Sequence, residues 1–304
     1  MSIENLTFSE YKTLSIHKGQ ISKIAFFPSG NFISVSSDKS IIIWDKNLND
    51  FDIIKNAHNS YITDIYIENE NNFITCSADL SIKFWEKKNN KFFNKNKIEN
   101  VSEYTLIKIT LLNSNLLITC GDDILKLWNK NKINEKYYLM TIISNSTFLN
   151  SFIIFLDKDL LIIINEEGTI FYRFSTLTFI KIINNASCGG KNSIKRIDND
   201  RFIVGGREDK IMKIISINKM KIIKELKNDF FIMGICVINN LNLIITGGYI
   251  GNINVFSSVN YKTILYIYKA HLQTITGFKY FNKQLFSYSW DKKIKIWDIN
   301  IQQI

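Results

Sequence analysis

Residues 38–45 read DKSIIIWD, and the same pattern returns at residues 79–86 as DLSIKFWE and at residues 291–298 as DKKIKIWD. In each copy, apolar side chains occupy alternate positions ahead of the tryptophan, which is the period of a half-buried β-strand. A histidine stands 26 or 27 residues before each tryptophan, at His17, His58 and His271. This spacing indicates one structural unit that is repeated along the chain.

Four weaker copies fill the middle of the sequence. Residues 121–129, 167–173, 209–216 and 250–257 place Trp128, Arg173, Ile215 and Phe256 at the position of the tryptophan. The seven positions recur at intervals of 41–45 residues, and a period of roughly 40–45 residues is expected of four-stranded propeller blades. The fourth to sixth copies lack both the histidine and the tryptophan, so the blade boundaries between about residues 100 and 230 stay open.

The repeats resemble those of the WD40-repeat family, and the resemblance covers essentially the whole chain. It implies an all-β fold, a seven-bladed WD40 β-propeller with four antiparallel strands per blade, in which residues 1–304 form a single domain. It also implies hydrogen-bonded sets of a loop histidine, a strand serine or threonine, a turn aspartate and a strand tryptophan. Carried over by position, these structural tetrads are His17, Ser34, Asp38 and Trp44; His58, Thr75, Asp79 and Trp85; and His271, Ser287, Asp291 and Trp297.

The two ends of the chain are expected to share one blade. The sequence ends a few residues after Trp297, while residues 8–16 precede His17 as residues 50–55 precede His58. We therefore expect the N-terminal strand, at about residues 8–16, to complete the last blade. Closing the ring in this way covers strand edges that would otherwise pair with other chains.

The sequence contains no motif of an enzyme. Phosphate-binding, dinucleotide-binding, zinc-protease and serine-nucleophile patterns are missing from it. Acidic residues near the turns between the second and third strands are interpreted as solvated turn residues: Asp122, Asp123, Glu166, Glu167, Glu208 and Asp209. We therefore predict a protein that is not an enzyme and has no cofactor and no metal site.

Several features predict an intracellular protein, cytoplasmic or nuclear. Four widely separated cysteines without a CxxC pair (Cys76, Cys120, Cys188 and Cys236) favour reduced, buried thiols. The N-terminus lacks the layout of a signal peptide. The apolar runs are too short to cross a bilayer of about 30 Å, so no membrane partner is expected.

Partner-binding candidates are aromatic or flexible apolar residues near the loops of one propeller face. In the resembled family, partners often dock on the face formed by the turns between the second and third strands and the loops into each first strand. Large aromatic side chains carry much of the binding energy at protein interfaces. The candidates on this face are Tyr61, Phe231, Met233, Tyr249 and Trp290. For Trp290, packing on the neighbouring turn is an equal alternative.

The net charge of +10 leaves nucleic acid open as a partner. The lysines are scattered over the whole chain, and the Asn-, Ile- and Lys-rich composition is what an AT-rich genome produces. A possible basic patch lies in the fifth copy, at Lys191, Lys195, Arg196, Arg201 and Arg207.

Three functions follow from these features. The leading hypothesis is a non-catalytic protein-interaction scaffold or adaptor subunit, a monomeric propeller within a larger multiprotein complex whose partner proteins the sequence does not identify. The first alternative is an RNA-associated propeller subunit of an RNA-processing or ribosomal particle. The second alternative is a phosphopeptide substrate receptor of a ubiquitin ligase, which would require several arginines around the channel. Arg173 and Arg207 do not make such a set.

Overall fold

The computed structural model is built almost wholly of β-strands, with one short 3-10 turn at Asn239–Leu241. The alternating apolar pattern of the repeats accounts for this, since each such segment buries one face when it pairs. The residues that the structure describes are 6–103, 105–113, 115–121, 124–131, 136–144, 153–157, 159–164, 168–190, 192–206 and 209–301.

These residues form seven antiparallel four-stranded sheets, which are the blades of a β-propeller. The prediction of an all-β, seven-bladed fold is therefore confirmed. We call the strands of each blade a to d in sheet order, and number the blades along the chain. The first three blades consist of β2 (Ile21–Phe26), β3 (Phe32–Ser36), β4 (Ile41–Trp44) and β5 (Phe51–Ile54); β6 (Ile62–Asn69), β7 (Asn72–Ser77), β8 (Ile82–Lys88) and β9 (Lys91–Ile98); and β10 (Leu106–Asn113), β11 (Leu116–Gly121), β12 (Ile124–Lys130) and β13 (Tyr137–Ser144).

The last four blades follow the same plan. They consist of β14 (Ile153–Asp157), β15 (Leu160–Ile164), β16 (Gly168–Arg173) and β17 (Thr178–Asn184); β18 (Ile194–Arg196), β19 (Arg201–Gly205), β20 (Ile211–Ser216) and β21 (Lys221–Lys227); β22 (Ile232–Ile238), β23 (Leu243–Gly248), β24 (Ile253–Ser257) and β25 (Thr263–Ile267); and β26 (Ile275–Phe281), β27 (Gln284–Ser289), β28 (Ile294–Ile301) and β1 (Leu6–Leu14).

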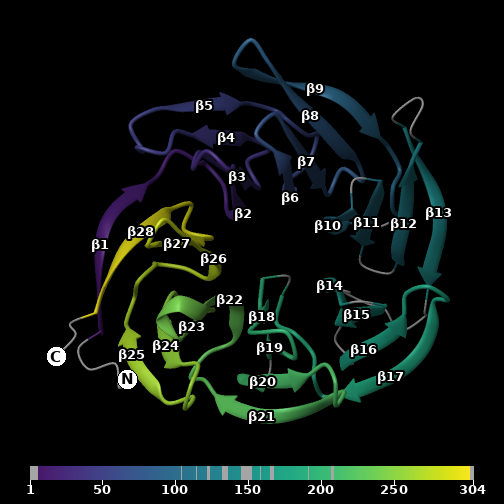
Figure 1. Ribbon diagram of the computed structural model, residues 1–304. Coiled ribbons are helices and arrows are strands. Elements are labelled where there is room, and N and C mark those ends of the chain that lie inside the picture. Colours follow the sequence, from purple (N-terminus) through teal and green to yellow (C-terminus); the bar gives the residue numbers. More distant parts are fainter. Residues whose placement is uncertain are drawn as a thin grey trace. The chain divides into compact units, whose positions relative to one another are not determined.

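Strand β1 completes blade 7, as expected. It pairs antiparallel with β28 from Leu6 opposite Ile301 to Leu14 opposite Ile294, and Figure 1 shows the purple β1 running beside the yellow β28. The strand begins and ends two residues earlier than the predicted 8–16. The shift follows from burial, because Leu6 and Leu14 are buried at its two ends whereas Ile16 is exposed.

The chain divides into two compact units, residues 25–187 and residues 1–24 with 188–304. In the first unit, apolar side chains of neighbouring blades pack face to face, as Ile33, Val35 and Ile41 of blade 1 do with Ile65 and Phe73 of blade 2. In the second unit, the same layering joins blade 5 to blade 6 and blade 6 to blade 7. Each interface buries the apolar face that the alternating pattern supplies.

A β-bulge marks the tryptophan position in the d strand of six described blades. The register shifts opposite Trp85, Trp128, Ile215, Phe256 and Trp297. In blade 4 the shift falls opposite Tyr172, which is buried, while the next residue, Arg173, is exposed. The prediction that Arg173 occupies the tryptophan position is therefore wrong by one residue, because the aromatic ring is the side chain that packs between blades 3 and 4.

Candidate functional site

The tetrads of blades 2 and 7 are hydrogen-bonded networks with the same geometry. Trp85 Nε1 donates to Thr75 Oγ1 at 2.9 Å, and His58 places Nε2 2.8 Å from the same oxygen and Nδ1 3.0 Å from Asp79. In blade 7 the corresponding distances are 2.9 Å from Trp297 Nε1 to Ser287 Oγ, 2.7 Å from His271 Nε2 to that oxygen, and 2.9 Å from His271 Nδ1 to Asp291.

Blade 1 carries the same four residue types. Trp44 Nε1 donates to Ser34 Oγ at 2.8 Å, and His17 is buried. Asp38 accepts from the backbone and the hydroxyl of Ser40 in the b–c turn. In all three blades the histidine and the tryptophan are buried, so these groups hold the fold and are not placed to meet a substrate.

Burial sets the protonation of the two tetrad histidines. It lowers the pKa of His58 and of His271 below the ordinary value, although the neighbouring aspartate acts in the opposite direction. Burial alone would raise the pKa of Asp79 and Asp291, but hydrogen bonds from the histidine and from backbone N–H groups hold it below the usual range. The network therefore consists of a neutral imidazole and an ionised carboxylate at neutral pH.

We expect the free energy of unfolding to fall as the pH is lowered from about 7.5 to about 5. The unfolded histidines take up protons near pH 6.5 while the folded ones stay neutral, so stability is fully present above that pH and is lost below it. Linkage limits the loss to about 1.4 kcal/mol per pH unit for each histidine. Urea unfolding at several pH values, with NMR titration of the histidine rings, measures it. Unchanged or rising stability towards pH 5 would contradict the assignment.

Blade 6 replaces its tetrad with an amide network that the sequence patterns did not reveal. Asn228 is buried at the histidine position, and its Oδ1 accepts from Asn254 Nδ2 at 3.1 Å. The Asn228 Nδ2 group donates to the carbonyl oxygen of Phe230 at 3.0 Å, and Thr246 Oγ1 lies 3.5 Å from Asn228 Oδ1. The network holds the loop between β21 and β22, which leads into blade 6 and contains Phe231.

Backbone hydrogen bonds hold the loops around Tyr249 in place. Tyr249 N donates to the carbonyl oxygen of Phe231 at 3.2 Å, and their rings lie 5.8 Å apart. In the next blade, His271 N donates to Gly251 O at 2.9 Å. Gly251 has a φ of 74°, and a side-chain carbon there would collide with the His271 carbonyl. The b–c turn of blade 6 therefore lies tightly against the d–a loop that leads into blade 7.

The tetrad of blade 7 extends this arrangement to Trp290. Asp291 accepts from Leu272 N at 3.1 Å, and Trp290 N donates to the carbonyl oxygen of Thr274 at 3.0 Å. Leu272 thus lies between two turns that are joined to its own loop by hydrogen bonds. Hydrogen bonds thus join these loops and turns in series, and we call the large side chains that they carry the Tyr249 patch: Phe231, Tyr249, Ile250, Leu272 and Trp290.

The exposed side chains of the Tyr249 patch are large and apolar. Tyr249 is 57 %, Ile250 51 % and Leu272 77 % exposed. Phe231 and Trp290 are half-buried, and Lys210 Nζ lies 5.5 Å from the centre of the Phe231 ring. Ile250 and Leu272 were not among the sequence candidates, because the sequence does not distinguish an apolar residue beside a turn from a residue of the core. Their positions next to Tyr249 and His271 were the available signal.

The remaining partner candidates lie elsewhere. Met233 is half-buried and packs near Gly190, in the same compact unit as the Tyr249 patch. Tyr61 belongs to the other unit, where its ring is exposed and its hydroxyl lies 3.5 Å from Thr105 Oγ1.

The described arginines of the predicted basic patch are engaged by neighbouring groups, in their own turn and, for Arg201, also at Tyr261. Arg201 forms an ion pair with Asp198 at 2.6 Å and donates to Tyr261 Oη at 2.8 Å. Arg196 donates to the carbonyl oxygens of Asp198 and Asn199 at 2.8 and 2.9 Å. Lys195 is half-buried on β18. Lys191 and Arg207 lie outside the described residues, as do Asp122, Asp123, Glu166, Glu167 and Glu208 of the turn acids.

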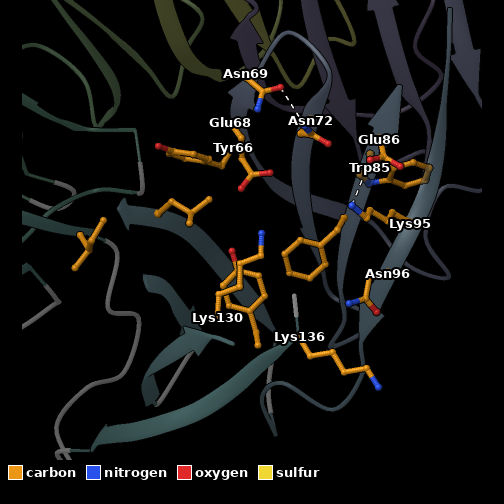
Figure 2. A pocket seen from close by; sticks show the side chains of 14 residues that line it. Tyr66, Glu68, Asn69, Asn72, Trp85, Glu86, Lys95, Asn96, Lys130 and Lys136 are labelled. Atoms are coloured by element: carbon orange, nitrogen blue, oxygen red, sulfur yellow. Dashed lines mark hydrogen bonds and ion pairs between the residues drawn. The ribbon is translucent and has the colours of Figure 1, made fainter. Parts of the chain in front are cut away.

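A groove of about 910 Å³ lies between blades 2 and 3. Figure 2 shows Tyr66, Trp85 and Glu86 on the side of blade 2, with Lys130 and Lys136 across from them. Of the residues singled out from the sequence, the tetrad residue Trp85 lines this groove, and no binding site was predicted there.

Neither a metal site nor a membrane-spanning helix is found in the described part of the chain. There, no group of three or more His, Cys, Asp or Glu side chains could hold a metal ion. Within the same residues, none of the helical structure has the length and apolar character needed to span a membrane.

Comparison with known proteins gives a family match for three parts of the chain. Residues 8–45, 51–86 and 262–298 match the model described as WD domain, G-beta repeat. Each match covers the d strand of one blade and the a, b and c strands of the next, in whole or in part, which agrees with the place of β1 in blade 7. No sequence among the curated proteins matches the chain.

Proposed function

The chain is a WD40-repeat β-propeller, and we propose that it acts as a non-catalytic adaptor that holds a partner protein on the Tyr249 patch. Proteins of this fold generally serve as interaction scaffolds. The observation that carries the proposal is the exposure of Tyr249, Ile250 and Leu272 on loops that hydrogen bonds hold rigid. Exposed apolar side chains gathered in one place mark interaction surfaces, and a preordered surface loses little entropy on binding.

The state of the described arginines and the apolar Tyr249 patch together favour a protein partner over RNA. Recognition of RNA phosphates and bases relies on arginines that are available to pair or stack, whereas Arg196 and Arg201 are engaged by groups of their own turn and, for Arg201, by Tyr261. The apolar character of the Tyr249 patch instead fits a hydrophobic anchor on a protein.

We also propose that the protein is located inside the cell, in the cytoplasm or the nucleus. All four cysteines lie among the described residues as buried thiols that form no disulfide, and burial raises the pKa of Cys120 to about 12 and of Cys236 to about 11. Such thiols are protonated and inert, which suits a reducing compartment.

Tyr249→Ala/Trp290→Ala is expected to weaken capture of partner proteins from a native lysate by about tenfold or more, the effect of 1.4 kcal/mol. Mass spectrometry of the captured proteins measures this. The control is Tyr11→Ala, because Tyr11 lies in the same compact unit, on the outer strand β1, and is 58 % exposed. A protein set that the double variant retains, or that Tyr11→Ala loses equally, would count against the Tyr249 patch.

A further inference from the structure

Strand β13 exposes more large apolar side chains than any other outer strand. Its sequence, YYLMTIIS, has no charged residue, and Tyr138, Leu139, Met140 and Ile142 are all exposed, Met140 by 64 %. The outer strands β1, β9, β17 and β21 each carry lysine, and β5 carries an aspartate. Strand β25, with the sequence TILYI, also lacks charge, but Tyr266 is its one exposed large apolar side chain. Charges on an edge strand discourage pairing with other chains, and β13 has none.

The backbone of β13 is placed to accept another strand. In the sheet order β10-β11-β12-β13 it is an edge strand, paired with β12 from Tyr137 opposite Lys130 to Ser144 opposite Ile124. An edge strand presents a row of N–H and C=O groups on its outer side, and proteins use such rows to bind extended peptides.

The groove between blades 2 and 3 adjoins the first residue of β13. Tyr137 lines it and stacks on Phe84, with ring centres 5.1 Å apart. Lys130 Nζ lies 5.9 Å from the centre of the Tyr137 ring. Figure 2 places Lys130, Lys136 and Lys95 around the opening.

The charge of this groove selects the chemistry of a ligand. Lys95, Lys130 and Lys136 line it together with two glutamates. One of these, Glu86, is already ion-paired with Lys88 and Lys95 at 3.2 Å each. Three lysines against two glutamates leave the lining with an excess of positive charge, which favours a ligand with carboxylates over one with lysines beside the aromatic floor.

We propose that β13 binds an extended segment of a partner protein as a fifth strand of blade 3, and that this segment carries acidic residues where it passes the groove. Its apolar side chains cover Leu139 and Ile142. For an antiparallel segment, the acidic residues lie at its C-terminal end, because the groove adjoins the N-terminal end of β13. This site belongs to the compact unit 25–187 and is independent of the Tyr249 patch, which lies in the other unit.

The test uses two fluorescein-labelled peptides, Val-Thr-Val-Thr-Val-Glu-Glu and Val-Thr-Val-Thr-Val-Lys-Lys. Fluorescence anisotropy with the full chain measures their affinities. We expect the acidic peptide to bind about tenfold more tightly than the lysine peptide, and to slow hydrogen exchange of the amides of residues 137–144. Equal affinities, or no binding of the acidic peptide up to about 1 mM, would overturn the proposal.

Two variants and one control locate the bound peptide. Leu139→Lys/Ile142→Lys should abolish binding of the peptide. Lys130→Glu/Lys136→Glu leaves the sequence of β13 unchanged and should reverse the preference between the two peptides. Phe179→Lys is the matched control, since Phe179 is an exposed apolar residue on the outer strand β17. Binding that survives Leu139→Lys/Ile142→Lys contradicts the site. A wild-type dimer that this variant dissociates would overturn the proposal by showing that β13 pairs with a second copy of the chain.

Discussion

A chain that lacks residues 1–16 is expected to be insoluble or oligomeric. Blade 7 loses its d strand, so β28 becomes an edge from Ile294 to Ile301. Leu6 and Leu14, which β1 buries, are lost from the core. At about 1.5–3 kcal/mol for each buried leucine, this loss removes a large share of the 5–15 kcal/mol that is typical of a folded domain.

Size-exclusion chromatography with light scattering, together with thermal melting, measures the effect of this deletion. A synthetic peptide of residues 6–16 provides the control, because it should pair with β28 and restore a soluble monomer. A truncated protein that is monomeric and melts at the wild-type temperature would show that β1 does not close blade 7.

Thr75→Val is expected to lower the free energy of unfolding by about 3 kcal/mol. Valine has the shape of threonine but no hydroxyl, so Trp85 Nε1–H and His58 Nε2 both lose the oxygen that they share at 2.9 and 2.8 Å. Thr75 is fully buried, and each buried polar group left without a partner costs about 1–3 kcal/mol. Urea unfolding of the purified variant measures the loss.

Two matched variants separate the contribution of the hydrogen-bonded network to the free energy of unfolding from the contribution of the threonine methyl group. Thr75→Ser keeps the hydroxyl and should cost only about 1 kcal/mol for the lost methyl. Thr246→Val changes the equivalent strand position in blade 6, where the hydroxyl makes only longer contacts of 3.3 and 3.5 Å. A loss at Thr246 as large as that at Thr75 would show that the tetrad adds nothing beyond ordinary burial.

The regular blades could be predicted from the sequence because their chemistry is specific. A buried indole N–H, an imidazole and a carboxylate need one another at fixed strand positions, and this need leaves a spacing that can be read along the chain. Blade 4 lacks those side chains, and the apolar run ahead of Arg173 fits two registers. The bulge opposite Tyr172 and the burial of its ring distinguish them, and both depend on the pairing and packing of β16.

The candidate surfaces were less predictable, because exposure depends on packing between segments far apart in sequence. Tyr249 was found from its place in a turn, whereas the exposure of Leu272, beside the buried His271, is seen only in the folded loop. The apolar sequence of β13 is typical of a buried strand. Its position at the edge of the sheet is what leaves Met140 exposed.

Capture from a native lysate with and without RNase tests the central claim, that this propeller is a protein adaptor, most directly. The wild type, Tyr249→Ala/Trp290→Ala and Tyr11→Ala are compared under both conditions. Our account predicts a protein set that RNase leaves intact, that the double variant loses and that Tyr11→Ala keeps. A set that RNase removes and that the double variant retains would contradict the account and assign the protein to an RNA-containing particle.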